Sequence, residues 1–376
     1  MGAGRQPGRG GDVSLAAQVA IGAISGTSMD GIDVALIRSD GAGFVAPGPG
    51  ATYPYPADVA AALRAVAMDP QMAAAPLEGL ERAVTDSHVG AIERFMAQFA
   101  VDRANVALVG LHGQTVLHRP REAYSRQLCD GARAAAALKL DVVNDFRAAD
   151  LKAGGEGAPL VPLYHAAMAS TLPKPLMLLN WGGVGNVTWL GAKGEIIAFD
   201  SGPASALLDD FMLRRRGLAY DEGGALAAEG AADPSILESL MDDGFFARPA
   251  PKSLDRNHFH AAGARVDALG DADGAATLAA FTVEATVAAL RRVPAPPSRW
   301  LVCGGGRRNL TLMRSLRARL GVAVDPIEDI GFAGDFVEAQ CFAYLALRSR
   351  LGLPLSLPTT TGVPAPQRGG VFWPWR

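Results

Sequence analysis

The sequence has few cysteines, no long hydrophobic run and little net charge. Its three cysteines form no CxxC pair and leave one thiol over in any disulfide scheme; they are Cys129, Cys303 and Cys341. This pattern suits a reducing cytoplasm and argues against a structural zinc site. No stretch reaches the roughly 18 apolar residues of a membrane span, so a membrane is not an expected partner.

Lysine is also scarce, with five in 376 residues, and no G-x-x-x-x-G-K-[ST] sequence occurs. A P-loop enzyme is thereby excluded. The absence of a G-x-S-x-G sequence excludes the nucleophile elbow of α/β-hydrolases. The 35 basic and 38 acidic residues are spread along the chain, with a formal net charge of -3 and no polybasic patch. Nucleic acid is therefore not expected as a partner, and a small molecule is.

What the sequence does contain is a repeated strand–turn–strand pattern. Residues 19–38 read as an apolar strand, a glycine-rich turn and a second apolar strand, and residues 176–190 repeat this plan near the chain midpoint. Such a pattern predicts two β-hairpins and two related halves. The composition, about half apolar, suffices for two domain cores.

Between and after the hairpins, helical and strand patterns alternate, which predicts α/β layers with a mixed sheet in each half. We expect helices at 58–68, 76–100, 131–139, 203–215, 233–242, 274–292, 309–319 and 334–348, and further strands at 105–111, 141–145, 195–199 and 299–303. The expected domains are 12–160 and 161–333, with helix 334–348 crossing back to the first. Residues 349–376 are expected to form an irregular tail.

The tip of the first hairpin combines glycines, hydroxyls and carboxylates: Gly26, Thr27, Ser28, Met29, Asp30, Gly31, Ile32 and Asp33. Glycines allow backbone N–H groups to approach phosphate oxygens, hydroxyls add donors, and a carboxylate can hold the metal that accompanies ATP. Taken alone, the segment is better explained as a tight turn with solvated aspartates. A lysine-free phosphate loop between two strands is, however, typical of actin-like kinases.

An ordered set of segments covering roughly residues 19 to 348 resembles the anhydro-N-acetylmuramic acid kinase family. After Gly26–Asp33 come His112-Gly113-Gln114-Thr115-Val116, Asp145-Phe146-Arg147, Gly157-Ala158-Pro159-Leu160-Val161-Pro162, Gly182-Gly183 with Asn186-Val187-Thr188, Phe199-Asp200-Ser201-Gly202-Pro203, Cys303-Gly304-Gly305-Gly306 and Glu338-Ala339. The resemblance implies a two-domain actin-like ATPase (ribonuclease H-like) fold: mixed sheets flanked by helices, with an interdomain cleft.

The resemblance also implies how ATP is bound. The loop from Gly26 to Asp33 would bind its phosphates, with Gly182, Gly183 and Asn186 in a second phosphate-facing hairpin. Gly304, Gly305 and Gly306 would lie near the adenosine, although a strand-to-helix turn explains these glycines as well. Asp30 and Glu338 would order Mg²⁺ directly or through water; for Glu338 a solvated or capping role is the alternative.

Asp200 follows an apolar strand and precedes Ser201-Gly202-Pro203, where Pro203 is well placed to begin a helix. A carboxylate beside a helix N-terminus would remain ionised, so Asp200 is either a helix cap or a base aimed into a cleft. A sugar kinase needs one carboxylate near the acceptor to take a proton. By resemblance, Asp200 would be the catalytic base.

Polar residues after the strand at 105–111 are candidates for sugar binding, because ligand-facing groups collect there in open α/β sheets. We expect His112, Gln114 and Thr115 to bind the sugar. Asp145 and Arg147 would orient its lactyl carboxylate, since Arg suits bidentate carboxylate recognition; an internal ion pair is the alternative.

The chain departs from the family pattern at several positions: Glu156 stands where Gln is usual, Trp181 where Ile is usual, and Arg307 where a small residue is typical. Ala204-Ser205 and residues 253–257 also differ. These changes bear on substrate preference more than on kinase chemistry.

By resemblance, the protein is an ATP-dependent cytoplasmic kinase that converts 1,6-anhydro-N-acetylmuramic acid to N-acetylmuramic acid 6-phosphate in peptidoglycan recycling. Asp200 would activate the water that opens the anhydro ring, and the protein would be a homodimer. The alternatives are another sugar or polyol kinase of the same superfamily, or an actin-like ATPase.

Overall fold

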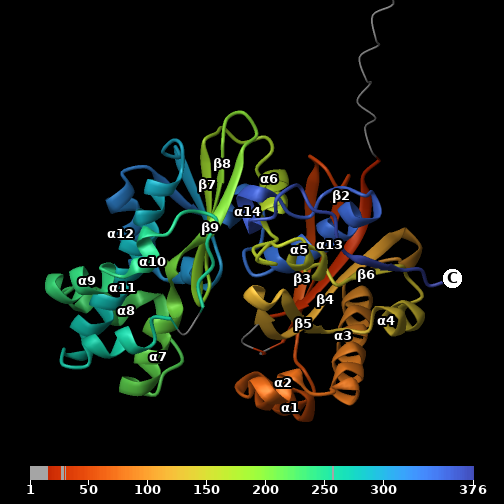
Figure 1. Cartoon of the computed structure of the whole chain (residues 1–376), viewed down its shortest axis with the longest axis horizontal. Coiled ribbons are helices and arrows are strands. Elements are labelled where there is room, and N and C mark those ends of the chain that lie inside the picture. The colour runs from red at the N-terminus through yellow and green to blue at the C-terminus, as the bar shows by residue number, and fades with distance from the viewer. Residues whose placement is uncertain (1–15, 27–28, 30, 256–257) are drawn as a thin grey trace, which may run out of the picture.

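The fold contains two mixed β-sheets, each covered by helices, and the two sheets lie in different halves of the molecule (Figure 1). The computed structural model describes the chain except for residues 1–15, 27–28, 30 and 256–257. The first sheet has the order β12-β6-β4-β1-β2-β3, and β5 pairs with β4. Its strands are β1 Gln18–Ser25, β2 Ile32–Ser39, β3 Val45–Tyr53, β4 Val106–Arg119, β5 Tyr124–Leu128, β6 Val142–Asn144 and β12 Val371–Trp373.

The second sheet repeats the plan of the first. Its order is β11-β10-β7-β8-β9. In each sheet an antiparallel meander is followed by a parallel pairing on the first strand of that meander. The strands are β7 Leu176–Trp181, β8 Val184–Leu190, β9 Ile196–Pro203, β10 Arg299–Cys303 and β11 Ala323–Pro326. The two hairpins and the related halves predicted from the sequence are therefore confirmed.

Helices cover both sheets, and most of them form where they were expected. The first half contains α1 Ala57–Met68, α2 Pro70–Ala74, α3 Glu78–Gln98, α4 Gly131–Leu138, α5 Ala148–Lys152 and α6 Pro162–Met168. The second contains α7 Ser205–Arg216, α8 Ala225–Glu229, α9 Pro234–Met241, α10 Gly244–Ala247, α11 Asp271–Ala288 and α12 Leu310–Leu320. Two more follow late in the chain, α13 Val337–Arg350 and α14 Pro358–Thr361.

Three apolar cores hold these layers together. One lies between the first sheet and α1, α3 and α4, and another joins the second sheet to α7, α11 and α12. The third is central: α6 and α13 bury apolar side chains against strands of both sheets. Helix α13 packs on β1, β2 and β4, so the late helix does return to the first sheet. By length and composition the segment Asp271–Arg292 could span a membrane, but 61% of its apolar window is buried inside the protein.

The structure corrects three local predictions. Strand β4 does not end at residue 111 but continues to Arg119, so His112 and Gln114 lie within it. Strand β9 runs through Asp200 to Pro203, and α7 begins only at Ser205, so Pro203 ends a strand instead of starting a helix. The C-terminal tail is not wholly irregular, because it contains α14 and β12, and β12 pairs antiparallel with β6 at the sheet edge.

Candidate active site

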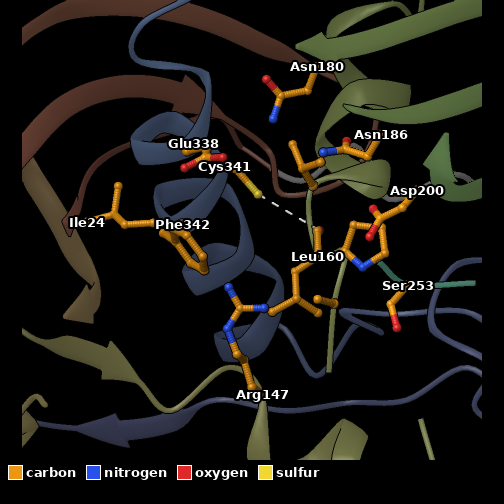
Figure 2. A pocket seen from close by; sticks show the side chains of 13 residues that line it. Ile24, Arg147, Leu160, Asn180, Asn186, Asp200, Ser253, Glu338, Cys341 and Phe342 are labelled. Atoms are coloured by element: carbon orange, nitrogen blue, oxygen red, sulfur yellow. Dashed lines mark hydrogen bonds between the residues drawn. The ribbon is translucent and has the colours of Figure 1, made fainter. Parts of the chain in front are cut away.

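A cavity of about 200 Å³ is lined by residues from both sheets and from α13. Figure 2 shows Asn180, Asn186 and Asp200 along one wall, with Ile24, Phe342 and Glu338 opposite and Arg147 below. Residues 158–161 and Ser253 complete the lining, together with Cys341. Amide and charged side chains from β7, β8 and β9 thus meet charged side chains from the start of α5 and from α13, which are far from these strands in the sequence.

Asp200 reaches this cavity from the middle of β9. Its backbone N–H donates to the carbonyl of Lys252 at 2.9 Å, and its Oδ2 accepts from the backbone N–H of Leu254 at 2.7 Å. Burial raises the pKa of Asp200 to about 7, although the Leu254 hydrogen bond and the charge of Lys252 act in the opposite direction. Desolvation is therefore the main influence on the Asp200 carboxyl, and no helix begins directly beside it, because α7 starts only at Ser205.

Lys252 lies close behind the base. Only 5% of its surface is exposed, its Nζ donates to the carbonyl of Phe245 at 2.9 Å, and the ammonium stands 4.0 Å from the centre of the Phe245 ring. Desolvation, reinforced by Arg292 and Arg248, lowers the pKa of Lys252 to about 8. A carboxylate whose pKa is about 7 is suited to accepting a proton at neutral pH.

Arg147 is held in place from two sides. Its Nε donates to Nε2 of His112 at 3.1 Å, and its Nη1 donates to the carbonyl of Gly157 at 2.7 Å. His112 is buried, and burial together with the Arg147 charge keeps its pKa well below the usual value. The neutral ring accepts from Arg147 at Nε2, and its Nδ1 lies 3.1 Å from the carbonyl of Gly113. His112 therefore lies behind Arg147 and orients it.

Glu338, at the start of α13, faces Arg147 across the cavity. The surrounding protein displaces bulk water and raises the pKa of its carboxyl, while Arg147 acts to lower it. The side chain itself stays open to the cavity and makes no hydrogen bond or ion pair with the described residues. An open carboxylate is a donor that fits Mg²⁺ or its water shell. No group of three or more metal-binding side chains occurs within the part of the chain that is described.

Other residues predicted for the sugar side point elsewhere. Gln114 is fully buried and joins the first hairpin: its Oε1 accepts from Ser25 Oγ at 2.5 Å, and its Nε2 donates to the Gly26 carbonyl at 3.2 Å. Thr115 Oγ1 accepts from Gln127 Nε2 at 3.1 Å. Asp145 accepts from the Ala148 N–H at 3.3 Å at the start of α5. Of the five predicted residues, the structure brings Arg147 to the cavity wall.

The first hairpin tip is partly described, and Thr27, Ser28 and Asp30 lie outside the described residues. The N–H of Met29 donates to the Gly26 carbonyl at 3.2 Å. Ile32 is buried in the core, and Asp33 accepts from Thr52 Oγ1 at 2.6 Å. Gly31 does not have a positive φ; a Cβ there would lie 2.6 Å from Thr52 Cγ2 on β3. Glycine is needed at this position for close approach to β3.

The second hairpin tip is fastened by α7. The carbonyls of Gly182 and Gly183 accept from the backbone N–H groups of Ser205 and Ala204 at 3.0 and 3.1 Å. These carbonyls occupy the free donors at the start of the helix. Asn186, on the outgoing strand β8, is paired with Asp200 in the β8–β9 register.

Gly304, Gly305 and Gly306 form the turn between β10 and α12. Gly304 has φ +75, and a Cβ there would lie 2.3 Å from Asn180 Oδ1. Arg307 clamps the turn, since its Nη1 donates to the Gly304 carbonyl at 2.8 Å and to Asp335 Oδ1 at 3.0 Å. Gly305 and Gly306 also line a second cavity of about 260 Å³ with Tyr220, Asp209 and other residues of α7 and α12.

Sequence reasoning missed Asn180, Ser253 and Phe342 as cavity residues. Asn180 carried a usable signal, because it is a polar residue at the end of the otherwise apolar segment Leu176–Leu179. Phe342 carried no such signal, because it is one apolar residue among many on helix α13. It reaches the site by packing against His112, with ring centres 4.3 Å apart. Glu156, noted only as a departure, accepts from Ser253 Oγ at 3.0 Å.

Two similarly ordered mixed sheets, glycine turns at the tips of two hairpins and a cavity lined from both sheets are the features expected of an actin-like phosphotransferase. A family model described as anhydro-N-acetylmuramic acid kinase matches residues 18–374, and the chain belongs to this family.

Relatives bearing that name support the assignment. The kinase of Rhodospirillum rubrum is 51% identical over 94% of this chain and 94% of its own. That of Acidiphilium cryptum is 49% identical over 93% of this chain and 97% of its own. A solved structure, (R)-2-hydroxyglutaryl-CoA dehydratase component A from Acidaminococcus fermentans, covers 89% of this chain and 99% of its own at 12% identity and TM-score 0.48. That likeness is too low to carry an argument.

Proposed function

We propose that the protein is an ATP-dependent kinase that converts 1,6-anhydro-N-acetylmuramic acid and water to N-acetylmuramic acid 6-phosphate, with release of ADP. The observation that carries the proposal is the cavity in which Asp200, with a pKa of about 7, shares a wall with Asn180 and Asn186 and faces Arg147 and Glu338. Membership in the anhydro-N-acetylmuramic acid kinase family supports the identity of the sugar.

The structure of the substrate determines which bonds form and which break. A 1,6-anhydro sugar has no free 6-hydroxyl, because O6 is bonded to the anomeric carbon. Asp200 takes a proton from a water whose oxygen bonds to that carbon, and the bond from the anomeric carbon to O6 breaks. O6 then bonds to the γ-phosphorus, and the bond from that phosphorus to ADP breaks. A base with a pKa near 7 is efficient in this role at neutral pH.

Arg147 is placed to bind the lactyl carboxylate of the sugar. Its Nε and Nη1 each have a protein partner, while Nη2 has none among the described residues. The guanidinium therefore has N–H groups left for an anion, and its plane is fixed before the sugar arrives. We propose that His112 acts through Arg147, and that Gln114 acts on the phosphate loop, without contacting the sugar.

ATP would be bound by turns of both halves. We propose that Gly26–Asp33 and the Gly182–Gly183 turn hold the phosphates and that the cavity beside Gly305 and Gly306 holds the nucleoside. Glu338, with Asp30, would order Mg²⁺, whose charge offsets that of the triphosphate. We further propose a cytoplasmic homodimer and a domain boundary near residue 160.

The test is a panel assay of ADP release with 1,6-anhydro-N-acetylmuramic acid, N-acetylmuramic acid, N-acetylglucosamine and glycerol. The proposal requires release that depends on the anhydro sugar, with 6-phosphorylated N-acetylmuramic acid as product. Preference for a sugar with a free hydroxyl would favour another sugar kinase, and release independent of any sugar would favour an ATPase.

A further inference from the structure

Asp150, on the short helix α5, is a buried carboxylate that faces only neutral donors. It is 2% exposed, and its Oδ1 accepts from the backbone N–H of Gly157 at 2.7 Å. Its Oδ2 accepts from the hydroxyls of Thr361, at 2.6 Å, and of Ser356. No Lys or Arg of the described chain forms an ion pair with it. A buried carboxylate that forms no ion pair depends on such hydrogen bonds, so this arrangement fixes its partners firmly.

These partners connect the C-terminal segment to a loop of the active site. Besides the bond from Thr361 to Asp150, the backbone N–H of Glu156 donates to the Thr361 carbonyl at 2.7 Å. The loop of residues 153–157 is thus clamped between α5 and α14. Its shape allows no side chain at Gly155, because a Cβ there would lie 2.2 Å from Asp150 Oδ1.

The clamped loop in turn holds Arg147. The carbonyl of Gly157 accepts from Arg147 Nη1 at 2.7 Å, while the N–H of the same residue is bonded to Asp150. One peptide therefore lies between the buried carboxylate and the guanidinium that faces the cavity. A shift of Gly157 would turn the plane of Arg147, because its other anchor, His112, fixes only Nε.

The same C-terminal segment also reaches the strand that carries the base. The hydroxyl of Thr359 donates to the carbonyl of Ile196 on β9, four residues before Asp200. Thr360 and Thr361 are buried, as are the apolar residues Leu355 and Val363 on either side of them. The segment therefore contacts both the strand that carries Asp200 and the loop that holds Arg147.

From these contacts we propose that the hydroxyls of Ser356 and Thr361 position the sugar site: together with Asp150 they hold Gly157, and through it Arg147, at the orientation that an anionic sugar requires. The inference rests on the proposed function, in which Arg147 binds the sugar carboxylate. It assigns a contribution to sugar binding to residues that lie outside the cavity lining.

The test compares Thr361→Val, which removes the hydroxyl bonded to Asp150, with Thr361→Ser, which keeps it. A matched control is Thr360→Val, because among the described residues the Thr360 hydroxyl bonds only the backbone of Leu357, the N-cap of α14. We expect Thr361→Val to raise the Kd for the anhydro sugar about tenfold, the usual scale for a buried partner left unsatisfied, with the Kd for ATP unchanged. Thr361→Ser and Thr360→Val should stay near the parent.

Two further variants keep the test decisive. Ser356→Ala removes a different donor to Asp150 and should weaken sugar binding in the same direction if Thr361→Val does not fold. Arg147→Ala tests the sugar contact of Arg147 separately from the contacts that position Arg147. If Arg147→Ala weakens sugar binding and neither clamp variant does so selectively, the positioning role is overturned. If Arg147→Ala leaves sugar binding unchanged, the proposed role of Arg147 is wrong, and the inference falls with it.

Discussion

The two hairpins share a plan but are fastened in different ways. The β1–β2 tip is held by a side chain, since the Gln114 amide bonds Ser25 and the Gly26 carbonyl. The β7–β8 tip is held by backbone, since its carbonyls accept from the start of α7. Each sheet therefore presents a glycine turn, but different contacts hold the two turns in place. The repeated sequence pattern does not reveal this difference.

The third strands differ more. Strand β3 has the sequence Val-Ala-Pro-Gly-Pro-Gly-Ala-Thr-Tyr and no carboxylate, whereas the corresponding strand β9 carries Asp200. In the proposed function, the repeated plan would provide the turns that bind phosphates, and the departure from the repeat would provide the base. Substitutions in the two turns should weaken ATP binding, whereas substitution of Asp200 on β9 should slow the chemical step.

The largest expected effect is that of Asp200→Asn. We expect kcat to fall by about two to four decades, because a general base is lost, with ATP binding within a few-fold of the parent. Steady-state kinetics and ATP titration measure both quantities. Asp242→Asn, at an exposed position after α9, is the control. More than about a tenth of the parental rate would mean that Asp200 is structural.

The next effect concerns the turn after β10. Gly304→Ala should raise the KM for ATP by more than about tenfold, because alanine strains the positive φ and its Cβ overlaps Asn180. Gly321→Ala, at the C-cap of α12, is the matched control, since Gly321 also has a positive φ, of +67, and a Cβ there meets nothing within 4 Å. Equal KM values for ATP in the two folded variants would remove this turn from the nucleotide site.

A smaller effect is expected for Gln114→Leu, which keeps the volume of the side chain but leaves Ser25 and the Gly26 carbonyl without their partner. The KM for ATP should rise about tenfold and the KM for the sugar should not change. Kinetics with each substrate varied in turn measures this ratio. A selective rise in the KM for the sugar would instead support the original prediction that Gln114 contacts the sugar.

The smallest expected effect is the pH dependence of thermal stability, measured as the Tm. The pKa of Asp200 is raised in the folded state, so folding binds a proton, and stability falls as pH rises from about 4 through about 7. Asp200→Asn should therefore raise the Tm at pH 8 and lose this advantage near pH 4. In the parent, kcat/KM for the sugar should fall below pH 7 as the base is protonated. A Tm difference independent of pH would contradict the raised pKa.

The sequence predicted the hairpins and most helices because apolar periodicity and glycine turns are local signals. The strands predicted at 105–111 and 195–199 were too short, because β4 and β9 continue through polar residues that pair with β5 and β8. Arg147 and Asp200 were found from their motifs. The roles of Gln114 and His112 were not, because a buried polar side chain and one at a cavity wall have the same sequence pattern, and only packing separates them.

The central claim, that water opens the anhydro ring, is tested most directly by turnover in oxygen-18 water. The account predicts early label at the anomeric hydroxyl of the 6-phosphorylated product and none in the transferred phosphoryl group, with preformed product as the control for exchange. Sugar product without early label would contradict ring opening by water, and label in inorganic phosphate would indicate an ATPase.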